Sequence, residues 1–187
     1  MKVIKSCRKT VALEILPDMS VIVRAPYRMP EEDIERFVAS KKPWLDKNLA
    51  KMRLKLQEKK EIEQKTQKLG DEAIRKLADE ALKDFPERVK RYAPLVGVTY
   101  GRITIRNQKT RWGSCSSGGN LNFNCLLMLT PPEVRNSVVV HELCHRKEMN
   151  HSREFYAEVL RVFPEYYKWD KWLRENGKAI MYAGSHA

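Results

Sequence analysis

Three of the four histidines of this 187-residue chain lie in one short segment, VVVHELCHRKEMNHSREF (138–155). His141, Glu142 and His145 form an H-E-x-x-H motif there. Residues four apart on an α-helix lie one turn apart and point in nearly the same direction, so two such imidazoles can bind one ion. Glu142 projects in a neighbouring direction, within reach of a water on that ion but outside the ligand set. The motif predicts a helix that carries a metal site, and His186 is assigned no role.

The residues around the motif predict where this helix begins and how the chain continues. Thr130 and Glu133 can form a capping box around the two prolines between them, which predicts a helix over 131–149. Asn150 is expected to adopt the left-handed conformation that reverses the chain. Ser152 is expected to cap the following helix, REFYAEVLRVF, which ends at Pro164.

The reversal brings a third histidine toward the first two. Catalytic zinc sites usually have three protein ligands and one open position, and His151 is the predicted third ligand. Zinc is the expected ion, although another divalent metal would suit the same ligands. The ion would acidify a water, and Glu142 would act as general base, taking its proton and passing it to the leaving group.

Two other interpretations of the histidines remain open. His141 and His145 could be an ordinary pair on a helix surface, or the ion could be structural, with Cys144 or Glu148 as fourth ligand. Cys144 is rotated by about 100° from His145 on a helix, so its thiol is expected to pack rather than bind metal. The sequence therefore favours an open, catalytic site.

The rest of the chain alternates strand and helix signals, which predicts an α+β fold. A β-hairpin is expected around Pro17-Asp18 and closes at Pro26. Further strands are predicted in GVTYGRITIRN, where Val98, Tyr100, Ile103 and Ile105 would pack, and in LNFNCLLML. Helices are predicted after Pro30, after Pro43 and from Asp71, the last one disturbed at Pro86.

Composition indicates a cytoplasmic protein. The hydrophobic content is 42%, and no apolar run approaches the roughly 18 residues that a membrane span needs. The N-terminal residues lack the apolar stretch and cleavage site of a secretory signal. The four cysteines form no C-x-x-C pair, which is typical of reduced thiols. No membrane partner is expected.

The net charge of +12 is concentrated in the N-terminal part of the chain. Residues 1–110 contain 26 Lys and Arg against 16 Asp and Glu, whereas residues 111–187 contain 10 against 8. This surplus predicts association of the N-terminal region with a polyanion such as nucleic acid. The alternative is that the lysines only keep a helical surface soluble.

The block KTRWGSCSSGGNLNFN (109–124) is the predicted substrate-binding region. A strand beside the metal helix can hold an extended substrate by main-chain hydrogen bonds, and LNFN is the candidate for that open edge. Its Asn122 and Asn124 are therefore expected to bind substrate, and Lys109 and Arg111 to face an anionic group. The glycines of the block would allow close backbone approach. Alternatively, Trp112 and these glycines form a packed turn that only supports the helix.

Together these segments resemble a known family. The hairpin RKTVALEILPDMSVIVRAP, the helix EEDIERFVASKKPWL, the TRWGSCS block and HELCH followed by NHS are similar to the YgjP-like metal-dependent hydrolases, relatives of the SprT-like and Wss-type peptidases. The resemblance implies a minimal zincin-like domain over 71–180, a small mixed or antiparallel sheet packed on the metal helix. It also implies a separate region over 1–70 with the hairpin and basic helices. In this resemblance His141, His145 and His151 bind the ion.

The sequence departs from two related patterns. YgjP-like proteins often carry an extra strand pair before the RWGSCS region, and KKEIEQKTQKLG is too short to provide it. The three histidines also match the outline of the metzincin peptidases, but Glu148 stands where those have glycine. Met181 resembles their methionine turn, yet it lies in a segment predicted to be a C-terminal tail.

Three functions follow from these features. The first is a zinc peptidase, acting on proteins held near nucleic acid, which predicts an exposed strand edge along a groove. The second is a metal-dependent phosphohydrolase acting on nucleotides, which predicts a smaller cavity with Lys109 and Arg111 converging on the metal. The third is a nucleic-acid-binding module with a structural zinc, which predicts four protein ligands.

Overall fold

The computed structural model describes residues 1–185, so His186 lies outside the described residues. Packing divides the chain into two compact units, Met1–Glu61 and the residues from Ile62 onward. The division falls within a helix, whereas the sequence analysis placed it at residue 70. Among the residues described, no helix combines the length and apolar character needed to cross a membrane.

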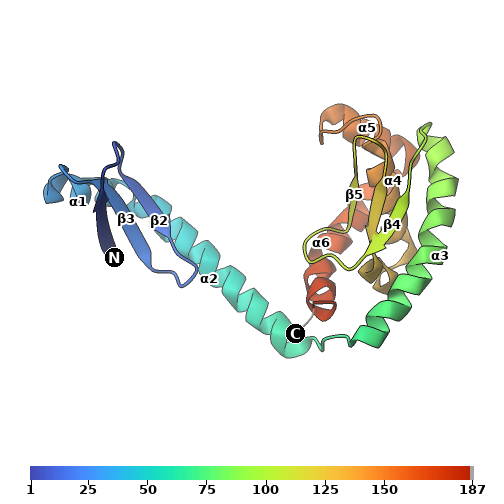
Figure 1. Cartoon of the computed structure of the whole chain (residues 1–187), viewed down its shortest axis with the longest axis horizontal. Coiled ribbons are helices and arrows are strands. Elements are labelled where there is room, and N and C mark those ends of the chain that lie inside the picture. Colours follow the sequence, from blue (N-terminus) through green and yellow to red (C-terminus); the bar gives the residue numbers. More distant parts are fainter. Residues whose placement is uncertain (186–187) are drawn as a thin grey trace. The chain divides into compact units, whose positions relative to one another are not determined.

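The N-terminal unit is a three-stranded sheet with helices (Figure 1). The predicted hairpin is confirmed, because β2 (Ala12–Ile15) pairs antiparallel with β3 (Val21–Pro26). The strand β1 (Lys2–Ser6), which was not predicted, pairs parallel with β3 on its other side. A small core forms where Ile34 of α1 (Glu31–Ser40) meets the buried residues of β3. Helix α2 (Lys42–Lys65) follows.

The second unit contains a mixed sheet of order β4-β6-β5. Strand β6 (Leu121–Asn124) pairs parallel with β4 (Ile103–Arg106) and antiparallel with β5 (Gly113–Cys115). The LNFN strand is therefore central, and the expectation that it offers an open edge is wrong. The two edges are β4 and β5, and β5 lies within the segment whose glycines suggested a packed turn as the alternative.

Two further segments of this unit differ from the predictions. Only the first four residues of LNFNCLLML are strand; the others form the 3₁₀-helix η1 (Cys125–Leu129). The strand ends because the Asn124 side chain accepts a hydrogen bond from the Leu126 amide (3.1 Å) and starts the new turn. Tyr100, expected to pack, is 38% exposed because it precedes the strand β4.

Helix α3 (Asp71–Val96) continues through Pro86, where a disturbance was predicted, and through Pro94. Proline inside a helix costs about 3 kcal/mol through a lost hydrogen bond and a steric clash. Phe85 and Val89 on either side of Pro86 are fully buried, and the Phe85 ring stacks on Phe123 of β6 with centroids 4.6 Å apart. Burial of such side chains offsets the cost, since each contributes about 1.5–3 kcal/mol.

The H-E-x-x-H motif lies at the end of α4 (Pro132–Cys144), which contacts α3, α5 (Arg153–Val162), α6 (Tyr166–Ala183) and β5. A helix surrounded in this way is apolar on most of its sides, as VVV before the motif shows. The predicted capping box is absent: the N-cap is Pro131, and the Thr130 hydroxyl donates to the Leu127 carbonyl instead (2.7 Å). Met181, placed in a tail by the sequence analysis, lies in α6 and packs against the core.

Candidate active site

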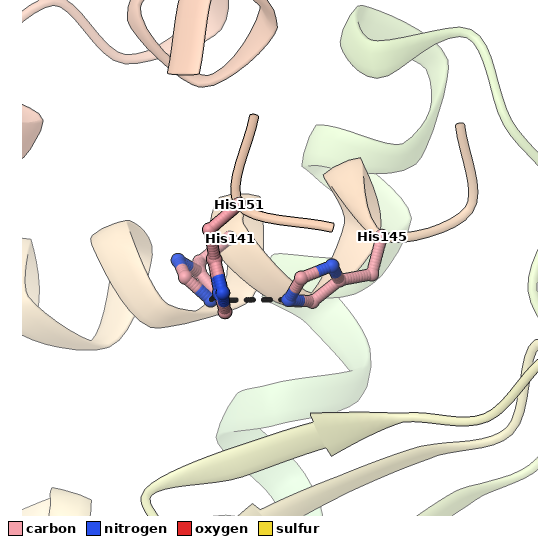
Figure 2. Close-up of side chains that lie close together, drawn as sticks. All are labelled: His141, His145 and His151. Atoms are coloured by element: carbon pink, nitrogen blue, oxygen red, sulfur yellow. Dashed lines mark hydrogen bonds between the residues drawn. The ribbon is translucent and has the colours of Figure 1, made fainter. Parts of the chain in front are cut away.

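The ring nitrogens of the three predicted histidines converge on one point. His141 lies in the last turn of α4 and His145 directly follows that helix, with their Nε2 atoms 3.2 Å apart. The Nε2 atom of His151 lies 3.0 Å from that of His141. Figure 2 shows the three rings pointing toward one another, with His151 coming from the chain after the helix.

The chain reverses between these histidines without the expected left-handed residue. Among the described non-glycine residues, Met19 alone has a positive φ, so Asn150 is not left-handed. Tight turns follow α4 instead: the Arg146 amide donates to the Leu143 carbonyl (3.0 Å) and the Lys147 amide to the Cys144 carbonyl (2.9 Å). The helix is therefore shorter than predicted.

In His141 and His145, the Nδ1 atom has a hydrogen-bond partner outside the cluster, and the Nε2 atom faces the other histidines. His141 Nδ1 is 2.8 Å from the Tyr166 hydroxyl, and His145 Nδ1 is 3.0 Å from the Glu148 carbonyl oxygen. A carbonyl oxygen accepts only, so His145 is protonated at Nδ1 and its Nε2 lone pair points to the centre. Lone pairs that converge in this way repel one another unless a cation lies between them. Around a tetrahedral zinc ion with Zn–N bonds of about 2.0–2.1 Å, the ligand nitrogens lie about 3.4 Å apart. The two separations from His141 Nε2, 3.2 and 3.0 Å, are close to this spacing, and the ligand atoms of all three histidines lie within 4.8 Å of one another.

Neither proposed fourth ligand joins this cluster. Within the described part of the chain, the group of metal-binding side chains here consists of the three histidines alone. Cys144 is buried in the core, and burial raises the pKa of its thiol to about 12, so the group stays protonated. Burial also lowers the pKa of His141 to about 3, with further effects of His145 and His151, which keeps this imidazole neutral.

Phe155 supports all three histidines and was not predicted as a site residue. It is fully buried in the first turn of α5, which Ser152 caps as predicted by accepting a hydrogen bond from the Phe155 amide (3.3 Å). The Phe155 ring lies 4.6 Å from the His145 ring, 4.9 Å from His141 and 5.0 Å from His151, centroid to centroid. The spacing of Phe155 from Ser152 marks it as a first-turn residue, but its contacts with α4 have no local signal.

Glu142 lies between α4 and the sheet, close to the edge strand. Its side chain is buried, and a Cβ atom added to Gly113 of β5 would lie 2.6 Å from its Oε1 atom. Burial raises the pKa of this carboxyl to about 8, and the charge of Arg111 opposes that shift. The carboxyl is therefore a stronger base than an exposed glutamate.

A pocket of about 230 Å³ lies beside Glu142 and His141. Its apolar lining comes from Trp112, Val138 and Leu173, and Arg111 and Asp170 add charged groups, among other lining residues. Trp112 also packs on α6, since a Cβ on Gly177 would lie 2.8 Å from its ring. Trp112 thus both supports the fold, as the alternative interpretation held, and lines the pocket.

The strand β5 has its free side directed away from the sheet. The Asn124 amide donates to the Trp112 carbonyl (2.8 Å) and the Ser116 amide to the Asn120 carbonyl (3.0 Å). Since hydrogen-bonded residues alternate along an antiparallel pair, the backbone groups of Gly113 and Cys115 point away from β6. These groups can pair with an added extended chain.

Comparison with known proteins identifies the family. The model of the YgjP-like family, metallopeptidase domain, matches residues 9–69 and 55–176. The chain belongs to the YgjP-like family. This membership supports a metal-dependent peptidase, as the resemblance of the sequence implied. No curated protein matches the chain.

Two solved structures are similar to part of this YgjP-like chain. One is the metallopeptidase zymogen abylysin of Pyrococcus abyssi, with 23% identity and a TM-score of 0.45. The other is the metallopeptidase zymogen jannalysin of Methanocaldococcus jannaschii, with 21% identity and a TM-score of 0.45. Each match covers 50% of this chain and 96% of the other.

The predicted substrate-binding residues occupy different places. Arg111 is exposed and lines the pocket, whereas Lys109 is exposed and is not one of its lining residues. Asn122 is half-buried and donates a hydrogen bond to the Ser114 hydroxyl of β5 (3.2 Å). Asn124 is fully buried and donates to the carbonyls of Gln108 (2.8 Å) and Arg111 (3.0 Å). Asn124 thus holds the loop that carries Arg111.

Proposed function

We propose that this YgjP-like protein is a zinc-dependent peptidase in which His141, His145 and His151 hold the ion and Glu142 is the general base. The observation that carries the proposal is the convergence of three Nε2 atoms next to a buried carboxyl at the free edge of β5. When bound, zinc would supply a Lewis acid that polarises the substrate carbonyl and acidifies a water. Other divalent metals would suit the same three nitrogens.

Glu142 would move the proton in this reaction. Its carboxylate accepts a proton from the attacking water and returns it to the nitrogen of the leaving amine. The raised pKa of about 8 makes the carboxylate basic enough to take that proton, and the positive charge of an ion held by the three histidines would favour its ionised form. Glu142 is 6% exposed and lines the pocket, so a water in the pocket can reach its carboxylate.

The substrate proposed is an extended peptide. The free backbone groups of Gly113 and Cys115 would pair with its main chain, and the pocket beside Glu142 would take an apolar side chain next to the scissile bond. The pocket volume of about 230 Å³ is below the roughly 300–1,000 Å³ of sites for drug-sized ligands, a class that includes nucleotides.

The nucleotide phosphohydrolase remains the second candidate, because Arg111 lines the pocket and could face a phosphate. Of Lys109 and Arg111, the two side chains expected to converge on the metal, Arg111 is the one that lines the pocket. A nucleic-acid-binding module with structural zinc receives less support, since three side chains rather than four form the cluster in the described residues.

A hydrolysis screen separates these functions. Zinc-loaded protein is incubated with denatured proteins and with nucleoside triphosphates. Glu142→Gln is compared with Glu165→Gln, which changes an exposed carboxylate that pairs with Lys168 and is not one of the pocket's lining residues. We expect cleavage of denatured protein next to apolar residues. Glu142→Gln should retain zinc and lose about 10²–10⁴-fold in turnover, while Glu165→Gln stays active.

Three results would count against the proposal. Wild-type turnover in Glu142→Gln would remove Glu142 as the base. Hydrolysis of nucleotides without any cleavage of protein would favour the phosphohydrolase. Loss of zinc in Glu148→Gln would indicate a closed, four-ligand site.

A further inference from the structure

The structure places a buried tyrosine hydroxyl behind the central histidine of the cluster. The Tyr166 oxygen is 2.8 Å from His141 Nδ1, the ring nitrogen that faces away from His145 and His151. Tyr166 begins α6 and is 5% exposed. Its ring is stacked on the His141 ring, with centroids 5.9 Å apart and 19° between the planes.

We propose that Tyr166 is a positioning residue for metal binding, whose oxygen accepts the Nδ1 proton of His141. That hydrogen bond fixes the tautomer in which Nε2 carries the lone pair, and it fixes the orientation of the ring. The inference rests on the metal-binding part of the proposed function and is independent of which bond the protein cleaves.

His141 needs a partner from another element because of its place in the helix. His145 follows the last residue of α4, so its Nδ1 reaches the Glu148 carbonyl in the next turn. His141 lies inside α4, where backbone carbonyls are used by the helix itself, as the bond from the His145 amide to the His141 carbonyl shows. A side chain must therefore supply the acceptor, and the first residue of α6 supplies it.

His141 is also the ligand whose orientation matters most. Its Nε2 lies within 3.2 Å of both other Nε2 atoms, so a rotation of this ring would separate it from both. The Phe155 ring meets His141 edge-on at 74°, and the Tyr166 ring lies nearly parallel to it, at 19°. Packing thus holds the plane of the ring, but a 180° flip would only exchange each nitrogen with a ring carbon of similar size. In the metal-free protein, the hydrogen bond to Tyr166 favours one of these two orientations.

The test is the zinc affinity of Tyr166→Phe, which removes the hydroxyl and keeps the ring. Zinc is titrated into the full-length metal-free protein in competition with a chromophoric chelator, and the Kd is compared with that of the wild type. We expect a Kd about 10–100-fold higher, the usual effect of removing a hydrogen-bond partner of a metal-binding histidine. Tyr167→Phe is the matched control. Tyr167 follows Tyr166 in α6 and is 50% exposed, so its loss of a hydroxyl should leave the Kd for zinc unchanged.

A second measurement observes the tautomer of His141 directly. Nitrogen-15 NMR of the zinc-loaded wild type should show His141 protonated at Nδ1, with a proton that exchanges slowly with water. In Tyr166→Phe that proton should exchange faster, while circular dichroism of the metal-free protein shows whether the fold is kept.

The possible outcomes separate this inference from the proposed peptidase. A folded Tyr166→Phe protein with the wild-type Kd would overturn the role of Tyr166 and leave the peptidase proposal standing. Binding of zinc through Nδ1 of His141 would overturn it as well, even if the variant fails to fold. If the wild type bound no zinc, both proposals would fall together, whereas tight zinc binding without peptide cleavage would remove the peptidase alone.

Discussion

Gly113 shows what the site requires of a single residue. The Glu142 carboxyl fits against β5 because Gly113 has no side chain: a Cβ there would lie 2.6 Å from Oε1 and 2.8 Å from Cγ of Glu142. Contacts this short force either the carboxyl or the strand to move. The glycine thus sets the distance between the proposed base and the proposed substrate edge.

We therefore expect Gly113→Ala to lower kcat/KM for peptide cleavage by about 100-fold, the effect typical of a 1 Å misplacement of a catalytic group. Zinc affinity should be kept, because the three atoms nearest to the added Cβ all belong to Glu142 and none to a histidine. Gly118→Ala is the control, since its Cβ would meet only the Ser116 hydroxyl, at 3.9 Å. Equal kcat/KM in Gly113→Ala and wild type would show that Glu142 does not depend on this contact.

Single residues were predictable where their signal is local. The H-E-x-x-H spacing follows from helix geometry, and Ser152 could be recognised as a cap from its neighbours in sequence. Tyr166 and Phe155 could not, because their contacts with His141 join helices that only the tertiary fold brings together. The hydrogen bonds of Asn124 could not be predicted for the same reason: the sequence shows a polar residue on a strand, while its backbone partners at 108 and 111 are brought to it by the fold.

At the scale of elements, an ion pair network fastens α5 beside the metal helix. Glu158 of α5 contacts Lys147 in the turn after α4 (2.6 Å) and Arg161 one turn along α5 (2.7 Å). Arg161 also donates to the Leu95 carbonyl near the end of α3 (2.8 Å). Because α5 carries Phe155, this network helps to hold the ring on which the histidines rest.

The network predicts how stability depends on pH. Hydrogen bonding from Arg161, followed by the effects of Lys147, lowers the pKa of Glu158 to about 2 from its ordinary value of 4.5. A lowered pKa in the folded state means that the carboxylate stabilises the fold above pH 4.5 and that this contribution is lost as the pH falls toward 2. Thermal unfolding should show Glu158→Gln to be less stable than wild type by about 1 kcal/mol at pH 7. The difference should shrink below pH 4.5, and a gap that stays constant down to pH 2 would contradict the assignment.

Elements were predicted well where the pattern is periodic and poorly where packing overrides propensity. The hairpin of β2 and β3 and the start of α3 at Asp71 agree with the sequence analysis. Pro86 has a strong local signal for a helix disturbance, but the burial of its neighbours outweighs it. The strand β5 has no periodic pattern in three residues, so only its pairing with β6 reveals it.

For the whole molecule, the net positive charge is denser in the N-terminal unit. Met1–Glu61 contains 15 Lys and Arg against 9 Asp and Glu, a surplus of six, and the second unit, about twice as long, carries the other six positive charges. Its helix α2 presents the exposed lysines Lys47, Lys51 and Lys55 at four-residue spacing, which places them along one side of the helix. This arrangement supports the proposal that the N-terminal unit binds nucleic acid and thereby brings the peptidase unit to its substrates.

Salt dependence tests that proposal. The affinity of a protein for duplex DNA falls with salt, with a slope in log–log form of about −0.9 for each phosphate neutralised. Replacing the three α2 lysines by glutamine should therefore weaken binding at low salt and make the slope less steep by up to about 2.7. The matched control replaces Lys76, Lys83 and Lys90, three exposed lysines of α3, and should leave the slope unchanged. Negligible binding of the wild type at low salt would show that the surplus charge only keeps the surface soluble. Equal losses in both triple variants would show that α2 is not a dedicated anchor, since a dedicated anchor must lose more affinity when its own contacts are removed.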